Sequence, residues 1–406
     1  MTTSPSQPDS TAGQSPPASQ RESRLFTLPF VLLLVVQSLY GTAYSTCFIL
    51  PKFLLEQWHA SATLIGNANG AFALSGALSV PFVGPLLDRW GRRPVLLAGL
   101  CLAVVTFAPL GYLTTPSALY ALRAVHGLVF SMVFSAGSAI AVDLAPPSRR
   151  AEAMGYFGTA MLATNGFGPT LAEQIALHFG WALVFVLCSL YSSGALLTAL
   201  RLEVRQHVLA AGSSLSVPLS WPLAGAYLAS IGIGIGVGVS KTFIPALMIT
   251  EGASRVAPYF LAFTLGALVQ RTVFGWVPDR VGRLRATVLA LAFYALSLAL
   301  MVVSNVWFIV LMSGFMGMAH GAAYPAATAM TLDLAKRSEH GRASAWATGL
   351  FNLGVAIAAS GFARFETSIG YRGLIGLGAA SILFIAYLTQ RWASMSPVPV
   401  PDVPLS

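Results

Sequence analysis

The feature that most constrains this chain is a series of twelve apolar runs, each 19 to 27 residues long, separated by charged or Pro- and Gly-rich turns. A helix needs roughly 20 apolar residues to cross the hydrocarbon core of a bilayer. Charged residues are 9% of the chain and hydrophobic residues 56%, whereas a soluble domain is about 25% charged. A water-soluble fold could not hide so much apolar surface, so we expect an all-α membrane protein in contact with a lipid bilayer.

The runs predict twelve transmembrane helices over residues 27–50, 62–87, 94–113, 117–142, 151–174, 180–200, 221–247, 256–278, 286–304, 306–332, 342–364 and 371–391. Residues 1–24 are rich in Ser, Thr, Pro and Gln, and we expect a disordered N-terminal tail because such a composition cannot bury enough apolar surface. The longest internal connection, residues 201–220, is the expected cytoplasmic linker between a bundle at 25–200 and a bundle at 221–392. Residues 393–406 then form the C-terminal tail.

The distribution of basic residues predicts the orientation of these helices. If the N-terminus is cytoplasmic, sixteen of the 23 Lys and Arg residues fall in cytoplasmic segments and four fall in outer segments, namely Lys52, Arg255, Arg364 and Arg372. Short cytoplasmic loops of membrane proteins are enriched in Lys and Arg. We therefore expect an integral protein of a bacterial inner membrane, with both termini in the cytoplasm.

Several classes of function are disfavoured by the sequence. The three cysteines lie inside apolar runs without CxxC spacing, so we expect neither a disulfide framework nor a metal site. The net charge of +9 is scattered in short clusters between apolar runs, which does not indicate nucleic-acid binding. No phosphate-binding GxxxxGK[ST] loop and no HExxH motif is present, so we expect no cofactor, no direct use of ATP and no enzyme.

An internal repeat divides the chain into two halves. Residues 84–93 read GPLLDRWGRR and residues 275–285 read GWVPDRVGRLR, so both fit GxxxDRxGR at an offset of 191 residues. Asp143 lies 55 residues after Asp88, and Asp333 lies 54 residues after Asp279. Two parallel six-helix repeats explain this spacing. The expected fold is therefore two pseudo-symmetric six-helix bundles.

GPLLDRWGRR resembles the signature between the second and third helices of the major facilitator superfamily, and the weaker second copy and the six-plus-six layout are similar to that family. The resemblance covers roughly residues 25–392. It implies a conformational latch, which holds the halves in one state and releases them in the other, at Gly84, Asp88, Arg89, Gly91, Arg92, Asp143, Asp279, Arg280, Arg283 and Asp333. Gly84 would let the second helix pack closely on a neighbour, and Asp88 or Asp143 would pair with Arg92. The alternative is that the arginines only anchor the topology.

Ionisable residues inside a membrane are costly, so each is a candidate functional residue. Arg123 stands in LxxxRxxHG, which resembles the family's fourth-helix motif, and the resemblance associates this arginine with proton coupling. His126 lies three residues later on the same helical face and titrates near neutral pH. We therefore predict proton coupling by Arg123 and His126. Outward snorkelling of Arg123 and a structural role for His126 are the alternatives.

Other polar side chains are candidates for lining a solute cavity. We expect Tyr40, Tyr44, Lys241, Arg271 and His320 to line it. Snorkelling is the alternative for Lys241 and Arg271, and contacts between helices are the alternative for Tyr40, Tyr44 and His320. No Asp or Glu lies in the middle of a predicted helix. The interior therefore favours neutral, zwitterionic or anionic solutes over cationic drugs.

Gly168-Pro169 in the fifth predicted helix resembles a degenerate form of the antiporter signature GxxxGPxxGG, in which Ala172 and Glu173 replace the Gly pair. The expected effect is a kink beside the partner helix of the other half. The resemblance implies proton-coupled efflux of a small organic solute by alternating access, in a monomer whose partners are the solute and protons. An importer or uniporter of a metabolite, or a solute sensor that does not transport, is the alternative.

Overall fold

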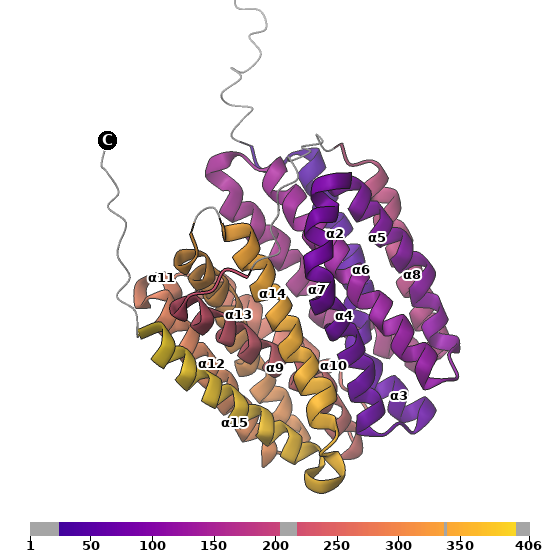
Figure 1. Cartoon of the computed structure of the whole chain (residues 1–406). Coiled ribbons are helices and arrows are strands. Elements are labelled where there is room, and N and C mark those ends of the chain that lie inside the picture. The colour runs from indigo at the N-terminus through magenta and orange to yellow at the C-terminus, as the bar shows by residue number, and fades with distance from the viewer. Residues whose placement is uncertain (1–23, 204–216, 337–338, 395–406) are drawn as a thin grey trace, which may run out of the picture.

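The structure, a computed structural model, describes residues 24–203, 217–336 and 339–394. Residues 1–23 and 395–406 of the expected tails and most of the expected linker at 201–220 lie outside these residues. Within them the regular structure is helical, without a strand, and the helices form two groups side by side (Figure 1). We call residues 24–203 the first half and residues 217–394 the second half.

The first half, drawn from indigo to magenta in Figure 1, contains α2 (Leu28–Thr46), η1 (Cys47–Ile49), α3 (Leu50–Trp58), α4 (Ala62–Trp90), α5 (Arg92–Phe107), η2 (Ala108–Tyr112), α6 (Pro116–Leu144), η3 (Pro147–Arg149), α7 (Arg150–Phe179) and α8 (Trp181–Leu200). The second half, drawn from pink to yellow, contains α9 (Trp221–Thr250), α10 (Ala257–Val273), α11 (Val277–Val281), α12 (Arg283–Val302), α13 (Val306–Leu334), α14 (His340–Ala356), η5 (Ile357–Phe362) and α15 (Glu366–Ser394).

Ten helical stretches among the described residues are long and apolar enough to cross a membrane. The other two of the twelve expected spans correspond to α7 and α10, which contact each other across the two halves. Helix α10 has 17 residues, which is short for a spanning helix, and both helices contribute to the wall of the cavity described below. The architecture is thus consistent with twelve spanning helices.

The first spanning segment is longer than the expected 27–50. Helices α2, η1 and α3 form one stretch from Leu28 to Trp58, and Pro51 stands in the first turn of α3, where a proline costs no intrahelical hydrogen bond. Lys52, which we placed in an outer loop, is therefore a helical residue and is buried. The eighth expected span is shorter than predicted, because α10 ends at Val273 and α11 follows as a separate short helix.

The repeat of the sequence is also a repeat of the packing. A Cβ atom at Gly127 of α6 would lie 2.1 Å from the carbonyl oxygen of Phe72 in α4, and one at Gly317 of α13 would lie 1.9 Å from that of Phe263 in α10. Each glycine stands 16 residues before the aspartate that ends its helix, Asp143 or Asp333. Equivalent glycines thus bring equivalent helix pairs into backbone contact.

The glycines of α9 pack inside the second half and not at the interface between the halves. A Cβ atom at Gly234 would lie 2.0 Å from the carbonyl oxygen of Phe351 in α14, and one at Gly236 would lie 2.7 Å from the ring of Tyr294 in α12. The small residues therefore serve to place α9 at the centre of its own bundle.

Candidate functional site

The described residues enclose a cavity of about 1080 Å³ between the two halves. Its walls come from α4, α6 and α7 of the first half and from α9, α10, α13 and α14 of the second half. Pockets for drug-sized molecules typically measure about 300–1,000 Å³. The cavity is therefore large enough for a small organic solute, and a solute inside it would contact both halves.

The cavity opens at the end of the molecule that carries Asp88, Arg92, Asp279 and Arg283, which we call the motif end. The exposed residues Glu152 and Gly155 of α7 and Gly341 of α14 belong to its wall, and all three lie near the starts of their helices at this end. Glu152 is bound to Arg149 by two hydrogen bonds of 2.7 and 2.8 Å. The mouth therefore carries a paired carboxylate.

The opposite end is closed by a buried ion pair. The Nζ atom of Lys52 in α3 lies 2.6 Å from Oε1 of Glu173 in α7, and both side chains are at most 2% exposed. Lys52 Nζ also donates to the carbonyl oxygen of Ser254 in the second half at 2.7 Å. The carboxylate of Glu173 accepts hydrogen bonds from the backbone N–H groups of Val256 and Ala257, each at 2.9 Å. We call these five residues the clamp and their end of the molecule the clamp end.

Close packing of α4 against η5 adds to this closure. A Cβ atom at Gly66 would lie 2.2 Å from the carbonyl oxygen of Ala359, and one at Gly70 would lie 1.8 Å from Oγ of Ser360. Ser360 Oγ donates to the carbonyl oxygen of Gly66 at 3.3 Å. The two halves are thus in near backbone contact at the clamp end, where no side chain larger than hydrogen fits at these two positions.

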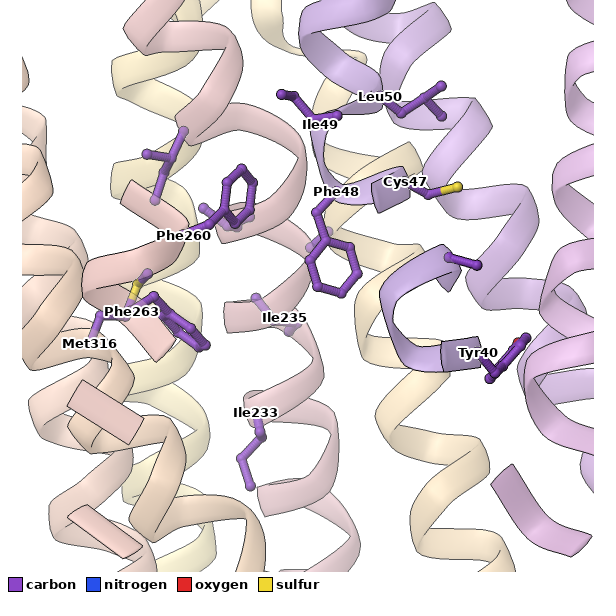
Figure 2. Close-up of a cluster of buried hydrophobic side chains, with 14 of the residues drawn as sticks. Tyr40, Cys47, Phe48, Ile49, Leu50, Ile233, Ile235, Phe260, Phe263 and Met316 are labelled. Carbon is purple, nitrogen blue, oxygen red and sulfur yellow. The ribbon is translucent and has the colours of Figure 1, made fainter. Parts of the chain in front are cut away.

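Aromatic side chains fill the space between the cavity and the clamp. Phe48 of η1 lies 6.1 Å from the ring of Phe260 in α10, and the Nζ atom of Lys241 in α9 lies 3.4 Å from the centre of the Phe48 ring. Tyr44 stacks on Phe130 of α6 at 4.6 Å. Figure 2 shows Phe48 between the two halves and Tyr40 pointing away from the second half, into the first half. The aromatic cluster therefore seals the inner end of the cavity.

The expected cavity residues are only partly brought together. Of the five, Arg271 lines the cavity in this conformation. Lys241 lies in the aromatic seal beside Tyr44, which its Nζ atom approaches to 5.8 Å. Tyr40 is buried inside the first half, and His320 faces Phe263 and Tyr294 inside the second half. The equivalence of Gly127 and Gly317 also shows that Met316, rather than His320, is the counterpart of His126.

Arg123 and His126 are both buried in α6, but neither belongs to the cavity wall. The guanidinium of Arg123 lies 4.7 Å from the centre of the Phe72 ring and donates to Oδ1 of Asn69 at 3.4 Å. Asn69 in turn donates to Oγ1 of Thr242 in the second half at 3.1 Å. His126 stacks on Phe107 at 4.4 Å. The structure thus connects Arg123 to the other half through Asn69 and places His126 inside its own bundle.

Glycines with left-handed backbone conformations explain the repeated motif. Gly91 has φ +87° and Gly282 has φ +92°, conformations that other residues rarely adopt. Each glycine ends one helix and begins the next, so that Arg92 and Arg283 start α5 and α12. Arg92 there forms an ion pair with Asp143 at the end of α6, and Arg283 forms one with Asp333 at the end of α13. The motif thus builds the same ion pair twice.

A family model for the Major Facilitator Superfamily matches residues 32–254 and, in a second match, residues 226–404. The chain belongs to the Major Facilitator Superfamily. It is therefore an integral membrane transporter of small solutes and not an enzyme.

Relatives in this superfamily differ in what their names describe. The gentisate transporter of Corynebacterium glutamicum is 24% identical over 346 residues, 79% of this chain and 75% of the relative. Multidrug resistance protein MdtG of Dickeya zeae is 25% identical over 351 residues, 79% of this chain and 82% of the relative. The fold is similar to that of a peptide transporter, POT, with a TM-score of 0.75 and 14% identity over 90% of this chain and 94% of that one. The human organic anion transporter MFSD10 has a TM-score of 0.69 and 18% identity over 93% and 100%.

Within this superfamily member the motif ion pairs lie inside the halves and not between them. Arg92 and Asp143 belong to the first half, and Arg283 and Asp333 belong to the second. Arg280 stacks on Trp276 at 4.5 Å. Asp88, Arg89 and Asp279 form no ion pair with another described residue. The expected pairing of Asp88 with Arg92 is therefore absent in this conformation, where the motif end is open, and a latch between the halves remains a prediction for the conformation in which that end is closed.

Two expected glycine contacts also differ from the prediction. Gly84 lines the cavity, and a Cβ atom there would meet nothing within 4 Å, because its helix has no close neighbour while the motif end is open. Gly168 packs on α2 of its own half, where a Cβ atom would lie 2.1 Å from Oγ of Ser45. The contact of α7 with the other half is made instead by Gly166, whose Cβ position lies 3.1 Å from Thr264. Helix α7 continues through Pro169 as a single helix.

Asp143→Asn should lower the thermal stability of the protein, because Arg92 then loses its charged partner. The side chains of Arg92 and Asp143 are 22% and 19% exposed, whereas those of Arg283 and Asp333 are 39% and 55% exposed. Solvent screens the second pair more strongly, so Asp333→Asn should lower the stability less. Melting temperatures of the purified variants in one detergent test this order, and an equal loss in both variants would contradict it.

Residues of the clamp and of the α4–η5 contact were not among the predicted site residues. Lys52 was assigned to an outer segment and Glu173 was considered as a departure from the antiporter signature, and nothing in their local sequence connects them. The one available signal was that each is a charged residue bordered by apolar residues: Pro51 and Phe53 flank Lys52, and Ala172 precedes Glu173.

Proposed function

We propose that this protein exports a small organic solute in exchange for protons by alternating access, and that the structure represents its cytoplasm-open conformation. The observation that supports this proposal is the asymmetric closure of the space between the halves. A cavity of 1080 Å³ extends inward from the motif end, and the buried clamp closes the other end. Rocking one half against the other would open the clamp end and close the motif end.

The orientation in this proposal follows from the basic residues. Arg89, Arg92, Arg93, Arg280, Arg283 and Arg285 all lie at the motif end, as the positive-inside rule expects of a cytoplasmic face. The clamp end then faces outward. The proposed direction of transport rests on the resemblance of Gly168-Pro169 to the antiporter signature. The names of the relatives do not decide the direction, because they include both a gentisate transporter and a multidrug resistance protein.

Glu173 is a further candidate for a role in proton coupling, beside Arg123 and His126. It is the one acidic residue that is fully buried among the described residues, and it binds both halves at once. Opening of the clamp would expose this carboxylate to the outer solution, where it can bind a proton. His126 lies against Phe107 inside its bundle and would need a larger rearrangement to meet water.

Solute flux into and out of proteoliposomes, measured for a panel of solutes with and without an imposed pH gradient, tests the proposed function. We expect at least one solute to move faster in the direction opposite to that in which protons flow down their gradient, as exchange requires. If no solute responds to the gradient, proton coupling is wrong. Acceleration in the same direction as the protons would identify an importer.

Two variants separate the proposed proton carriers. Glu173→Gln should abolish the response to the pH gradient while exchange of internal for external solute continues, because solute exchange needs no net proton movement. His126→Asn should retain the response if Glu173 carries the proton. Glu203→Gln is the matched control, since Glu203 is an exposed carboxylate at the motif end. A normal gradient response in Glu173→Gln together with a lost response in His126→Asn would assign the proton to His126.

A further inference from the structure

The cavity wall contains one charged group without a partner. Its described charged residues are Glu152 and Arg271, and Glu152 is bound to Arg149 at the mouth. Arg271 of α10 has no carboxylate within ion-pair distance among the described residues, and its buried Nε atom has no hydrogen-bond partner. An arginine remains charged at any physiological pH. The cavity therefore presents a single uncompensated positive charge.

Arg271 lies at the interface between the two halves. Its guanidinium is 3.3 Å from the position that a Cβ atom of Gly158 in α7 would occupy, and Gly158 belongs to the same cavity wall. The absence of a side chain at Gly158 leaves room beside the guanidinium. A group bound to Arg271 would therefore touch α10 of the second half and α7 of the first half.

Apart from neutral polar side chains such as Ser131, Gln270 and Asn352, the remainder of the wall is apolar and aromatic. Phe130, Phe134 and Phe157 contribute rings from the first half, and Tyr324 and Phe351 contribute rings from the second half. Phe130 stacks on Phe134 at 5.5 Å, and Tyr324 lies edge-on to Phe351 at 5.6 Å. Such surfaces bind flat apolar bodies through burial and ring contacts.

We propose that the cavity binds an amphipathic organic anion, whose carboxylate-like group pairs with Arg271 and whose apolar body lies against the aromatic walls. This inference rests on the proposed transport function and names its substrate class. A guanidinium presents two parallel N–H donors that match the two oxygens of a carboxylate, and such paired hydrogen bonds are stronger than neutral ones. An organic cation would face Arg271 without a free acidic partner in the described wall, so it is disfavoured.

Binding of ligands that share one ring system and differ in charge tests the inference. The probes are naphthoate, the neutral naphthamide and the cationic naphthylmethylamine, together with acetate, which has the charge without the apolar body. Affinities are measured by calorimetry on the purified full-length protein in nanodiscs. We expect naphthoate to bind more tightly than the other three.

Arg271→Gln should weaken naphthoate binding by about 10- to 100-fold, the range expected for hydrogen bonds to a charged group, and leave naphthamide binding unchanged. Arg271→Lys should give an intermediate loss, because it keeps the charge and loses the paired geometry. The matched control is Arg150→Gln, which removes an exposed positive charge from the same end of the molecule. Equal losses in Arg271→Gln and Arg150→Gln would assign the preference to the general positive potential and overturn the inference.

Two other outcomes also overturn the inference without affecting the proposed function. One is wild-type protein that binds no naphthoate, and the other is wild-type protein that binds naphthamide or naphthylmethylamine as tightly as naphthoate. Transport itself is decided separately, by the gradient-driven flux of any solute of the panel. The substrate class can therefore fail while proton-driven transport stands.

Discussion

Glu173→Leu is expected to open the clamp end and to populate the outward-facing conformation. The substitution removes the carboxylate 2.6 Å from the buried ammonium of Lys52, leaves it only the longer ion-pair contact of 3.7 Å with Glu56, and leaves the N–H groups of Val256 and Ala257 without their acceptor. Removing one partner of a buried ion pair typically costs about 3–5 kcal/mol. In the outward-facing conformation these groups reach water, so the substitution destabilises only the conformation with a closed clamp. The equilibrium between the two conformations therefore shifts toward the outward-facing one by about a hundredfold or more.

A cysteine at Thr242 reports the opening. This residue is 1% exposed and accepts a hydrogen bond from Asn69 of the other half, so it is accessible only after the halves separate at the clamp end. In a chain whose three native cysteines are replaced, we expect a membrane-impermeant maleimide added from outside to label Thr242→Cys slowly. Adding Glu173→Leu should accelerate the labelling about tenfold or more.

The double variant Lys52→Met with Glu173→Leu serves as the control for this result. Replacing both members of a buried pair with apolar residues is often neutral, so its labelling rate should lie between those of the parent and Glu173→Leu. A labelling rate in Glu173→Leu equal to that of the parent would show that the clamp does not hold the end closed.

Gly66→Val is expected to abolish transport by preventing closure of the clamp end. Its Cβ atom would lie 2.2 Å from the backbone carbonyl oxygen of Ala359 and 2.6 Å from the Cβ atom of Ala363, and neither atom can move without moving η5. Each bundle can accommodate the larger side chain once the halves separate, because the contact lies between them. The variant should therefore reach the membrane, retain its thermal stability and remain outward-facing in the labelling assay.

Gly84→Val is the matched control on the same helix. A Cβ atom at Gly84 would meet nothing within 4 Å in this conformation, so its substitution should leave the clamp end closed and Thr242→Cys protected. Any loss of transport in Gly84→Val should then arise from the opposite step, closure of the motif end. Equal labelling in Gly66→Val and Gly84→Val would contradict the assignment of Gly66 to closure of the clamp end.

The sequence predicted the parts of this fold that repeat. The spacing from Asp88 to Asp143 and from Asp279 to Asp333 indicated two equivalent halves, and the ion pairs of Arg92 and Arg283 confirm that equivalence. The physical reason is that these contacts join neighbouring helices of one bundle at their ends. Short-range motifs with a fixed offset therefore carry enough information to place them.

The contacts that close the clamp end were much harder to predict. Lys52 and Glu173 lie 121 residues apart in sequence, and their meeting depends on how α3 and α7 are tilted within the first half. Gly66 and Ala359 lie in different halves altogether, so their contact also depends on the conformation of the transporter. A single sequence specifies several such conformations, which is why Gly84 was expected in a contact that this conformation does not contain.

The hydrogen bonds from Val256 and Ala257 to Glu173 have a consequence for the structure of α10 itself. This helix has no side-chain cap from its own first residues, and its first N–H groups are satisfied by a carboxylate of the other half. A carboxylate at this position also interacts favourably with the positive end of the helix dipole. Separation of the halves would remove the acceptor and the charge together. The first turn of α10 would then either unwind or take its hydrogen bonds from water.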